Sequence, residues 1–120
     1  MKVLVLEDEY VLLKGAFDYL NVKYYGGNLE IKNIGRTQDV DMNNLNQYDK
    51  IFVDISLQQA SEMDGYSFIK AAEKWVDKAK LVVITGSDKV QQKIAEFGLG
   101  PLAILNKPVT FLDLRKVMPG

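Results

Sequence analysis

The sequence predicts an α/β fold in which five parallel strands form one doubly wound sheet with the strand order 2-1-3-4-5. Two observations lead to this prediction. Short apolar runs alternate with longer segments of helical period, which gives a (βα)5 pattern, and the runs read as strands buried on both faces. Right-handed crossovers then place helices on both sides of the sheet. The 120 residues suit one domain, so we expect a single domain over residues 1–120.

The first third of the chain supplies two strands and a helix. Val3–Leu6 is apolar at every position, and Leu29–Ile34 alternates between apolar and polar residues. A helix is expected from Glu9 to about Lys23, and the glycines at 26 and 27 mark the turn that follows it. One face of this helix is expected to carry its apolar residues, namely Val11, Leu12, Ala16, Tyr19 and Leu20.

The middle third supplies the third strand between two helices. Thr37 is expected to cap a helix that ends near Leu45, and Lys50–Asp54 forms the strand around three consecutive apolar residues. Residues 56–64 are polar and are expected to form a loop. A helix is expected over residues 65–76, with four apolar side chains on one side: Phe68, Ile69, Ala72 and Trp75.

The last third supplies the remaining two strands and two helices. Residues 80–85 carry the strongest strand signal of the chain, and Leu102–Leu105 forms the fifth strand. Ser87 or Asp88 is expected to cap the helix between them, whose apolar face is followed by Gly98 as its stop. A final short helix is expected over residues 110–118, after Pro108.

The composition excludes several classes of chemistry. The chain has no cysteine and no histidine, which excludes disulfides, thiolate and imidazole metal sites, and Ser-His triads. Any metal must therefore be held by oxygen, which points to Mg²⁺, Mn²⁺ or Ca²⁺. With 15 basic and 16 acidic residues we expect no broad nucleic-acid surface. Because no apolar run approaches the ~20 residues of a membrane span, we expect a cytoplasmic protein without a membrane segment.

Side chains of complementary chemistry follow four of the predicted strands. Glu7 and Asp8 follow the first strand, Asp54 ends the third, Thr85 ends the fourth, and Lys107 follows the fifth. The carboxyl ends of parallel strands meet at one edge, where such sheets bind ligands. Converging carboxylates require a cation such as Mg²⁺, and a hydroxyl and an ammonium beside it would hold phosphoryl oxygens. Asp54 would then be the nucleophile.

Each of these residues alone also has an ordinary structural explanation. Acidic residues after a strand are most often helix caps or turn residues, and Thr85 could cap the helix that follows it. Lys107 could be a solvated side chain on the way out of the sheet. The functional interpretation depends on all of them meeting at the same edge.

The set Glu7-Asp8, Asp54, Thr85 and Lys107-Pro108 resembles the receiver domain of two-component response regulators, over essentially the whole chain. The resemblance implies the flavodoxin-like strand order and a Mg²⁺ site, with Mn²⁺ as a substitute, held by Glu7, Asp8, Asp54 and the backbone carbonyl of Ser56. It implies that Asp54 takes a phosphoryl group from a sensor histidine kinase or a histidine phosphotransfer protein. Thr85 and Lys107 would hold the phosphoryl oxygens, and the Lys107–Pro108 bond would be cis.

The resemblance also implies a downstream protein target that reads the phosphorylated state, without direct nucleic-acid binding. No output domain is expected within residues 1–120. The domain would be an enzyme only in a limited sense, since it would catalyse its own phosphorylation and dephosphorylation.

Two features depart from the family pattern. The loop from Asp54 to Gly65 is longer by a few residues and carries Leu57-Gln58 where a Met-Pro step is usual. Ile104 stands where an aromatic switch residue is usual. These departures leave open the alternative of a pseudo-receiver, which would bind a protein without a phosphorylation cycle.

Two further classes fit the sequence less well. A Mg²⁺ phosphohydrolase or Toprim-type nuclease needs a second aspartate two residues after the first, where this chain has Ser56. A flavodoxin needs a phosphate loop after the first strand, where Glu7, Asp8 and Glu9 would repel phosphate.

Overall fold

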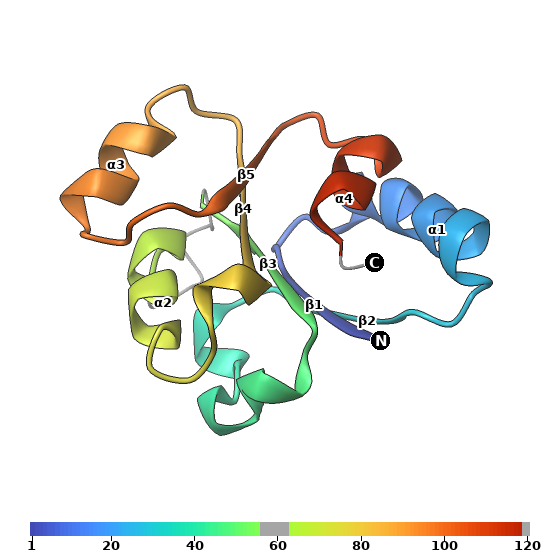
Figure 1. Ribbon diagram of the computed structural model, residues 1–120, viewed down its shortest axis with the longest axis horizontal. Helices are drawn as coiled ribbons and strands as arrows, with labels where there is room; N and C mark the ends of the chain where they lie inside the picture. The colour runs from blue at the N-terminus through green and yellow to red at the C-terminus, as the bar shows by residue number, and fades with distance from the viewer. Residues whose placement is uncertain (56–62, 119–120) are drawn as a thin grey trace.

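The computed structural model describes residues 1–55 and 63–118, which contain one sheet of five parallel strands in the order β2-β1-β3-β4-β5 (Figure 1). The strands are β1 (Lys2–Leu6), β2 (Glu30–Ile34), β3 (Lys50–Asp54), β4 (Leu81–Thr85) and β5 (Ala103–Asn106). The predicted sheet and its order are therefore confirmed.

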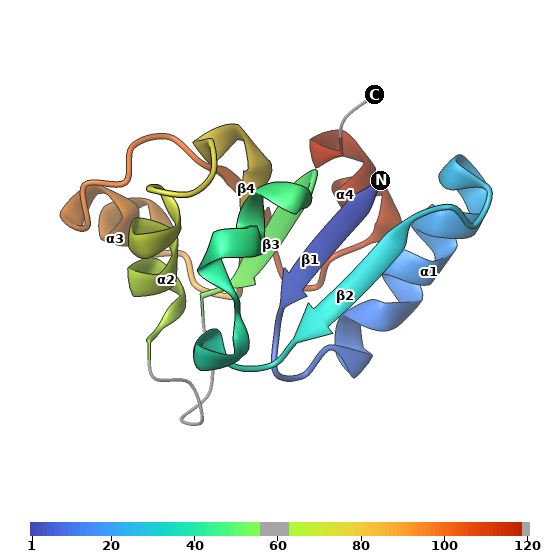
Figure 2. The same cartoon turned by 90° about the horizontal axis from the view of Figure 1, so that it is seen from below.

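Helices lie on both faces of the sheet (Figures 1 and 2). One face packs against α1 (Val11–Tyr25) and α4 (Phe111–Val117), and the other packs against α2 (Gly65–Ala72) and α3 (Val90–Glu96). The described residues also form three short 3₁₀ helices, which are η1 (Thr37–Asp39), η2 (Met42–Gln47) and η3 (Lys78–Lys80).

Each face of the sheet has its own core. Alternate residues of β1 point to opposite faces, so that Val3 and Val5 join the α1 side while Leu4 and Leu6 join the α2 side. All five residues of β4 are buried, as the continuous apolar run predicts for a central parallel strand.

The two edge strands do not follow that pattern. β2 and β5 are partly exposed, which corrects the prediction that all strands are buried on both faces. The reason is their position at the ends of the sheet, where each strand has one neighbour instead of two.

The expected helix over residues 37–45 is wrong. The segment instead forms η1 and η2, and Asp41 caps η2 through its side chain. A full helix is therefore missing from the connection between β2 and β3.

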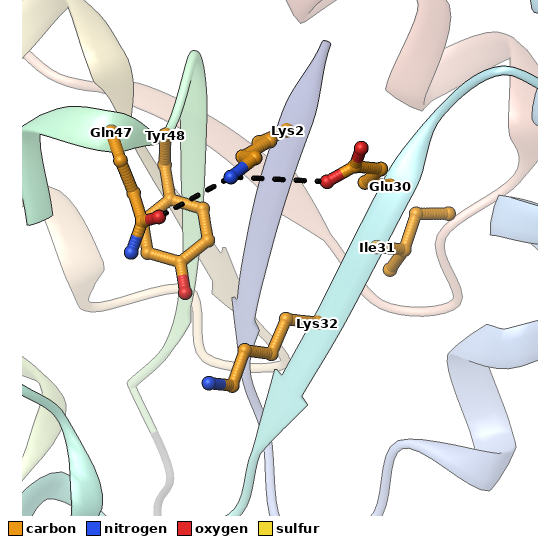
Figure 3. A pocket seen from close by; sticks show the side chains of 6 residues that line it. All are labelled: Lys2, Glu30, Ile31, Lys32, Gln47 and Tyr48. Carbon is orange, nitrogen blue, oxygen red and sulfur yellow. Dashed lines mark hydrogen bonds and ion pairs between the residues drawn. The ribbon is translucent and has the colours of Figure 1, made fainter.

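An open pocket of about 350 Å³ is bordered by polar side chains at the amino ends of β1 and β2 (Figure 3). Its lining residues are Lys2, Glu30, Ile31, Lys32, Gln47 and Tyr48.

The buried face of α1 also differs from the prediction. Leu20 is buried as predicted, and it is joined by Leu13 and Phe17. By contrast, Val11, Leu12 and Tyr19 are among the most exposed large apolar side chains of the described residues. Phe17 packs edge-on against Phe52 of β3, with 5.2 Å between ring centroids. The sequence alone does not show which face of α1 is buried, because apolar residues lie on both faces.

Other helix ends differ by a few residues. α2 ends at Ala72, and Trp75, placed by the sequence on the buried side, lies in the following turn and is 45% exposed. α3 begins after Lys89 without a side-chain cap, so neither Ser87 nor Asp88 caps it. The final helix begins at the predicted position, and Thr110 and Asp113 form a capping box at the start of α4.

One side chain on α1 holds the beginning of β2. The amide of Asn21 accepts a hydrogen bond from the backbone N–H of Leu29 (2.9 Å) and donates one to the carbonyl of the same residue (3.3 Å). Within the described residues, no helix is long and apolar enough to cross a membrane.

Candidate functional site

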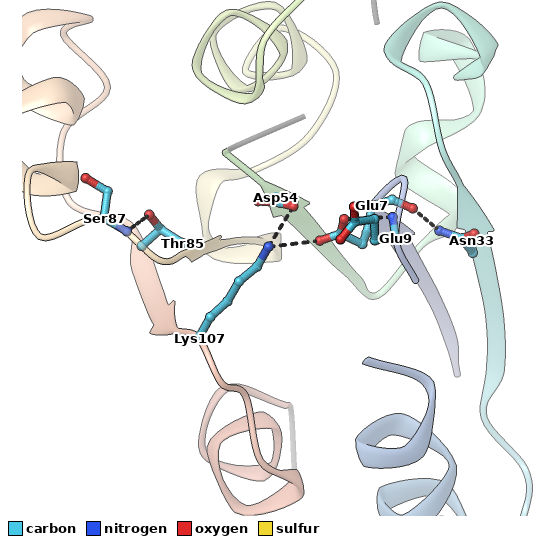
Figure 4. A network of polar contacts seen from close by, with 7 residues as sticks. All are labelled: Glu7, Glu9, Asn33, Asp54, Thr85, Ser87 and Lys107. Carbon is cyan, nitrogen blue, oxygen red and sulfur yellow. Dashed lines mark hydrogen bonds and ion pairs between the residues drawn. The ribbon is translucent and has the colours of Figure 1, made fainter. Parts of the chain in front are cut away.

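The carboxyl ends of β1, β3 and β5 bring Glu7, Asp54 and Lys107 together (Figure 4). Asp54 is the last residue of β3, and its neighbours in the sheet are the ends of β1 and β4. Lys107 reaches across from the segment after β5 to meet both carboxylates. The sheet register thus produces the convergence that the sequence predicts.

Three carboxylates form a tight cluster. One oxygen each from Glu7, Asp8 and Asp54 lies within 4.8 Å of the others. Glu7 and Asp54 are each only 2% exposed, while Asp8 lies closer to solvent. Like charges at this separation repel strongly in a buried setting, so the cluster needs a positive partner.

Lys107 is one such partner. Its Nζ donates a hydrogen bond to Asp54 Oδ2 at 3.0 Å and lies 3.5 Å from Glu7 Oε2. Burial by itself would lower the pKa of Lys107, but the hydrogen bond with Asp54 and the charges of both carboxylates outweigh it and raise the pKa. Lys107 therefore stays an ammonium. The Lys107–Pro108 peptide bond is cis, as the resemblance implies.

The pKa of Glu7 departs strongly from its ordinary value. Burial, followed by the adjacent Asp54 carboxyl, raises the pKa of Glu7 to about 8. Its Oε1 accepts a hydrogen bond from the N–H of Glu9 at 2.9 Å. Its Oε2 is buried and accepts no hydrogen bond. A buried carboxylate oxygen that accepts no hydrogen bond is well suited to coordinate a cation.

Thr85 is buried but is not joined to the carboxylates by a hydrogen bond. Its Oγ1 accepts the N–H of Ser87 at 2.9 Å and so holds the turn after β4. The N–H of Lys107 donates to the Thr85 carbonyl at 2.8 Å, which fixes the start of the β5–α4 segment against β4. The structure thus places Thr85 at the same edge, beside the cluster and not inside it (Figure 4).

Two side-chain contacts that join segments distant in the sequence were not predicted. The side chain of Asn33 donates to the carbonyls of Val5 (3.0 Å) and Glu7 (2.8 Å), which fixes the turn that carries the acidic pair. Thr37 is 3% exposed, and its Oγ1 accepts the N–H of Met63 at 3.1 Å. Neither contact could be predicted, because each joins segments about 26 residues apart.

Gly65 lies directly behind Asp54. A Cβ at this position would stand 2.7 Å from the Asp54 carbonyl oxygen and 2.7 Å from Ile55 Cα. The first residue of α2 therefore has to be a glycine for the helix to pack this closely against the end of β3.

Ser56 and Ile104 complete the set of residues that the sequence singles out. Ser56, whose carbonyl was expected to contact the metal, lies outside the described residues, as do Leu57 and Gln58. Ile104 is half-buried on β5 and packs against the core on the α2 side.

The cluster has an accessible side. A pocket of about 340 Å³ adjoins it, lined by Glu7, Leu12, Leu13, Lys107, Pro108 and Val109. A small anion could reach the ammonium and the carboxylate edge from here. By contrast, the pocket of Figure 3 lies at the amino ends of its strands, away from the edge where such sheets bind ligands.

This arrangement suits phosphoryl chemistry. Three carboxylates can share a divalent cation, and the ammonium can hold an oxygen of a bound phosphoryl group. Asp54 lies at the centre of these contacts.

Comparison with known proteins identifies the fold. No protein-family model matches the chain, and no curated protein matches its sequence. Solved structures do match. A CheY-like response regulator receiver domain protein from Methanospirillum hungatei JF-1 is similar with a TM-score of 0.73 and 20% identity, over 96% of this chain and 87% of that one.

Two further structures agree. A response regulator receiver domain protein from Clostridium thermocellum gives a TM-score of 0.73 at 21% identity, over 97% of this chain and 89% of that one. The receiver domain of NtrX from Brucella abortus gives 0.71 at 20% identity, over 96% and 92%. The chain thus has the fold of CheY-like receiver domains.

Proposed function

We propose that this protein is a phosphoacceptor receiver domain of a two-component system, in which Asp54 takes a phosphoryl group from phosphohistidine on a sensor histidine kinase or a histidine phosphotransfer protein. The observation that carries this proposal is the meeting of Asp54, two further carboxylates and the Lys107 ammonium at one sheet edge. The receiver fold supports it.

In the proposed reaction, an Asp54 carboxylate oxygen attacks the phosphorus atom. The P–N bond to the donor imidazole breaks, its electron pair stays on the imidazole, and an acyl phosphate forms on Asp54. Lys107, already 3.0 Å from Asp54 Oδ2, would hold one of the transferred oxygens. The Thr85 hydroxyl would hold another after exchanging its contact with Ser87.

The cluster fits a divalent cation, since Glu7 Oε2 is a buried oxygen without a hydrogen bond and lies among other carboxylate oxygens. Glu7, Asp8, Asp54 and the Ser56 carbonyl would hold Mg²⁺ or Mn²⁺. The ion would neutralise charge on the carboxylates and on the phosphoryl oxygens.

The surroundings of the site support a protein as the phosphoryl donor. Leu12 lines the pocket beside Glu7 and Lys107 and is 73% exposed, so an apolar contact is available next to the reacting atoms. The phosphorylated form would be read by a downstream protein, without direct nucleic-acid binding. A cytoplasmic location belongs to the same proposal.

Intact-mass analysis after incubation with Mg²⁺ and acetyl phosphate tests the proposal. We expect one base-labile phosphoryl group on the wild type, and none on Asp54→Asn or after chelation of the metal. Asp49→Asn, an exposed aspartate just before the other end of β3, is the matched control and should be modified like the wild type. An unmodified wild type would instead favour the pseudo-receiver.

A further inference from the structure

Among the described residues, α1 carries apolar side chains that nothing covers. Val11, Val22 and Leu12 are 78%, 74% and 73% exposed, more than any other large apolar side chain described. Val11 and Val22 share one stripe with Gly15 and Asp18, because the spacing 4, 3, 4 keeps residues on one side of a helix. This stripe lies opposite the buried Leu13, Phe17 and Leu20.

Gly15, in the middle of the stripe, has no side chain and leaves a depression in the surface of the helix. A Cβ at Gly15 would meet no atom within 4 Å, so the helix backbone is open to close approach there. Lys14 and Asp18 flank this position and form an exposed ion pair of 2.6 Å. A second helix could therefore cross α1 at Gly15 with apolar contacts at both ends and charged groups in between.

The stripe is complementary to itself. When two copies of α1 lie antiparallel about a two-fold axis, Val11 faces Val22 of the second copy, and Gly15 faces Asp18 of the second copy. Both pairs occur twice. Because Gly15 has no side chain, Asp18 of the second copy has room to reach Lys14, so the two ion pairs within the helices, one in each copy, can be exchanged for two between the helices.

From this complementarity, we propose that two copies of this chain associate through antiparallel α1 helices in a closed, two-fold dimer. The interface is small, so we expect a weak dimer that forms as concentration rises through the micromolar range and above. The charge pattern favours a second copy over an unrelated apolar partner, because such a partner would bury the exposed Lys14–Asp18 ion pair against apolar surface, whereas a second copy places opposite charges across from both residues.

The dimer would also affect access to the site. Leu12 lies beside Val11 on α1 and lines the pocket next to Glu7 and Lys107. A second copy on the stripe would therefore compete with a protein that docks at this pocket. The dimer itself does not depend on the proposed phosphorylation, so the two proposals can fail separately.

Sedimentation velocity over a wide concentration range gives the first test. The wild type should shift from monomer towards dimer, and Val22→Asp should remain monomeric at every concentration. Trp75→Asp is the matched control, since Trp75 is 45% exposed on the other side of the sheet, and it should dimerise like the wild type. A wild type that stays monomeric throughout, or a Val22→Asp that still dimerises, would overturn the proposal.

A charge exchange gives the sharper test. Lys14→Glu alone and Asp18→Lys alone each place like charges across the two-fold axis, and each should weaken self-association by about tenfold or more. Mixed in equal amounts, the two variants should form a heterodimer. The introduced glutamate of one copy then meets the introduced lysine of the other, and the unchanged Asp18 meets the unchanged Lys14. If the mixture stays as weak as the separate variants, the antiparallel α1 pairing is wrong.

Discussion

Replacing Gly65 by alanine should disturb the fold and the site together. The added methyl would lie 2.7 Å from the Asp54 carbonyl oxygen and from Ile55 Cα, about 0.7 Å short of the 3.4 Å at which ordinary contact begins. Both neighbours are backbone atoms of a buried strand end, so they cannot rotate away. Either α2 or the end of β3 has to move.

The expected cost follows from this overlap. Overpacking a buried position by one methyl group costs about 1–3 kcal/mol. Alanine has a lower conformational entropy than glycine in the unfolded chain, and this offsets part of the overpacking cost. We therefore expect Gly65→Ala to lower the free energy of unfolding by about 1–2 kcal/mol. Gly15→Ala is the matched control, since the same methyl meets nothing within 4 Å in the middle of α1. It should gain roughly 0.5–1 kcal/mol.

Urea unfolding of both variants measures these values, at a protein concentration low enough for the monomer. A second measurement is the increase in stability on adding Mg²⁺, which should be smaller for Gly65→Ala because Asp54 is displaced, and unchanged for Gly15→Ala. If Gly65→Ala proves as stable as the wild type, the close packing of α2 on β3 does not constrain the site.

Three further predictions concern single side chains. Asp8→Asn should stabilise the metal-free protein by about 1 kcal/mol in urea unfolding, because one repelling carboxylate is removed. The same substitution should reduce the stabilisation that Mg²⁺ confers. A loss of metal-free stability would contradict this prediction. Lys107→Ala should bind Mg²⁺ at least as tightly in calorimetric titration, because a competing cation is gone, yet should slow phosphorylation by acetyl phosphate by roughly tenfold or more; weaker Mg²⁺ binding would count against the proposed role. Thr110→Ala should cost about 1 kcal/mol at neutral pH through loss of the capping box. Hydrogen bonds from the backbone N–H and then from the hydroxyl of Thr110 lower the pKa of Asp113 in the folded state, so the part that the Asp113 carboxylate contributes is present above the unfolded pKa and is lost as pH falls through the folded one. The Thr110→Ala deficit should therefore shrink in acid without vanishing, because the Thr110 hydroxyl also accepts the N–H of Asp113 at every pH. Unfolding curves that show no deficit at neutral pH would refute the capping assignment.

Much of the sheet was predictable because its central strands carry a strong local signal. The apolar runs in β3 and β4 have no polar interruption, so their type and bounds follow from the residues themselves. Asp54 falls at a strand end for the same reason, and the parallel arrangement then implies that the other strand ends lie nearby.

The face of α1 was not predictable, for a physical reason. Periodicity assigns the buried side of a helix only when the opposite side is polar, and this helix carries Val11 and Val22 on its outer side. Hydrogen bonds between residues distant in the sequence were equally unpredictable. Asn33 reads as a polar residue in an alternating strand, and its support of the Glu7 turn depends on the register of β2 against β1.

The helix expected before β3 shows the limit of capping signals. Thr37 was placed at its start, but the hydroxyl instead accepts the N–H of Met63, so it serves a tertiary contact. Asn43 and Asn44 lower the helical preference of the segment, and the side chain of Asp41 engages both of them in η2.

The amide of Asn21 has a consequence for how the sheet can grow. By bonding both backbone groups of Leu29, it occupies the place that a neighbouring strand would take at the start of β2. Glu30 and Ile34 bond towards β1, so among the strand residues only Ile31 and Asn33 present backbone groups outward. Two such positions make a poor template, and an incoming chain would first have to displace a side chain that already satisfies the edge. The β2 edge of the sheet is thus a poor site for edge-to-edge aggregation.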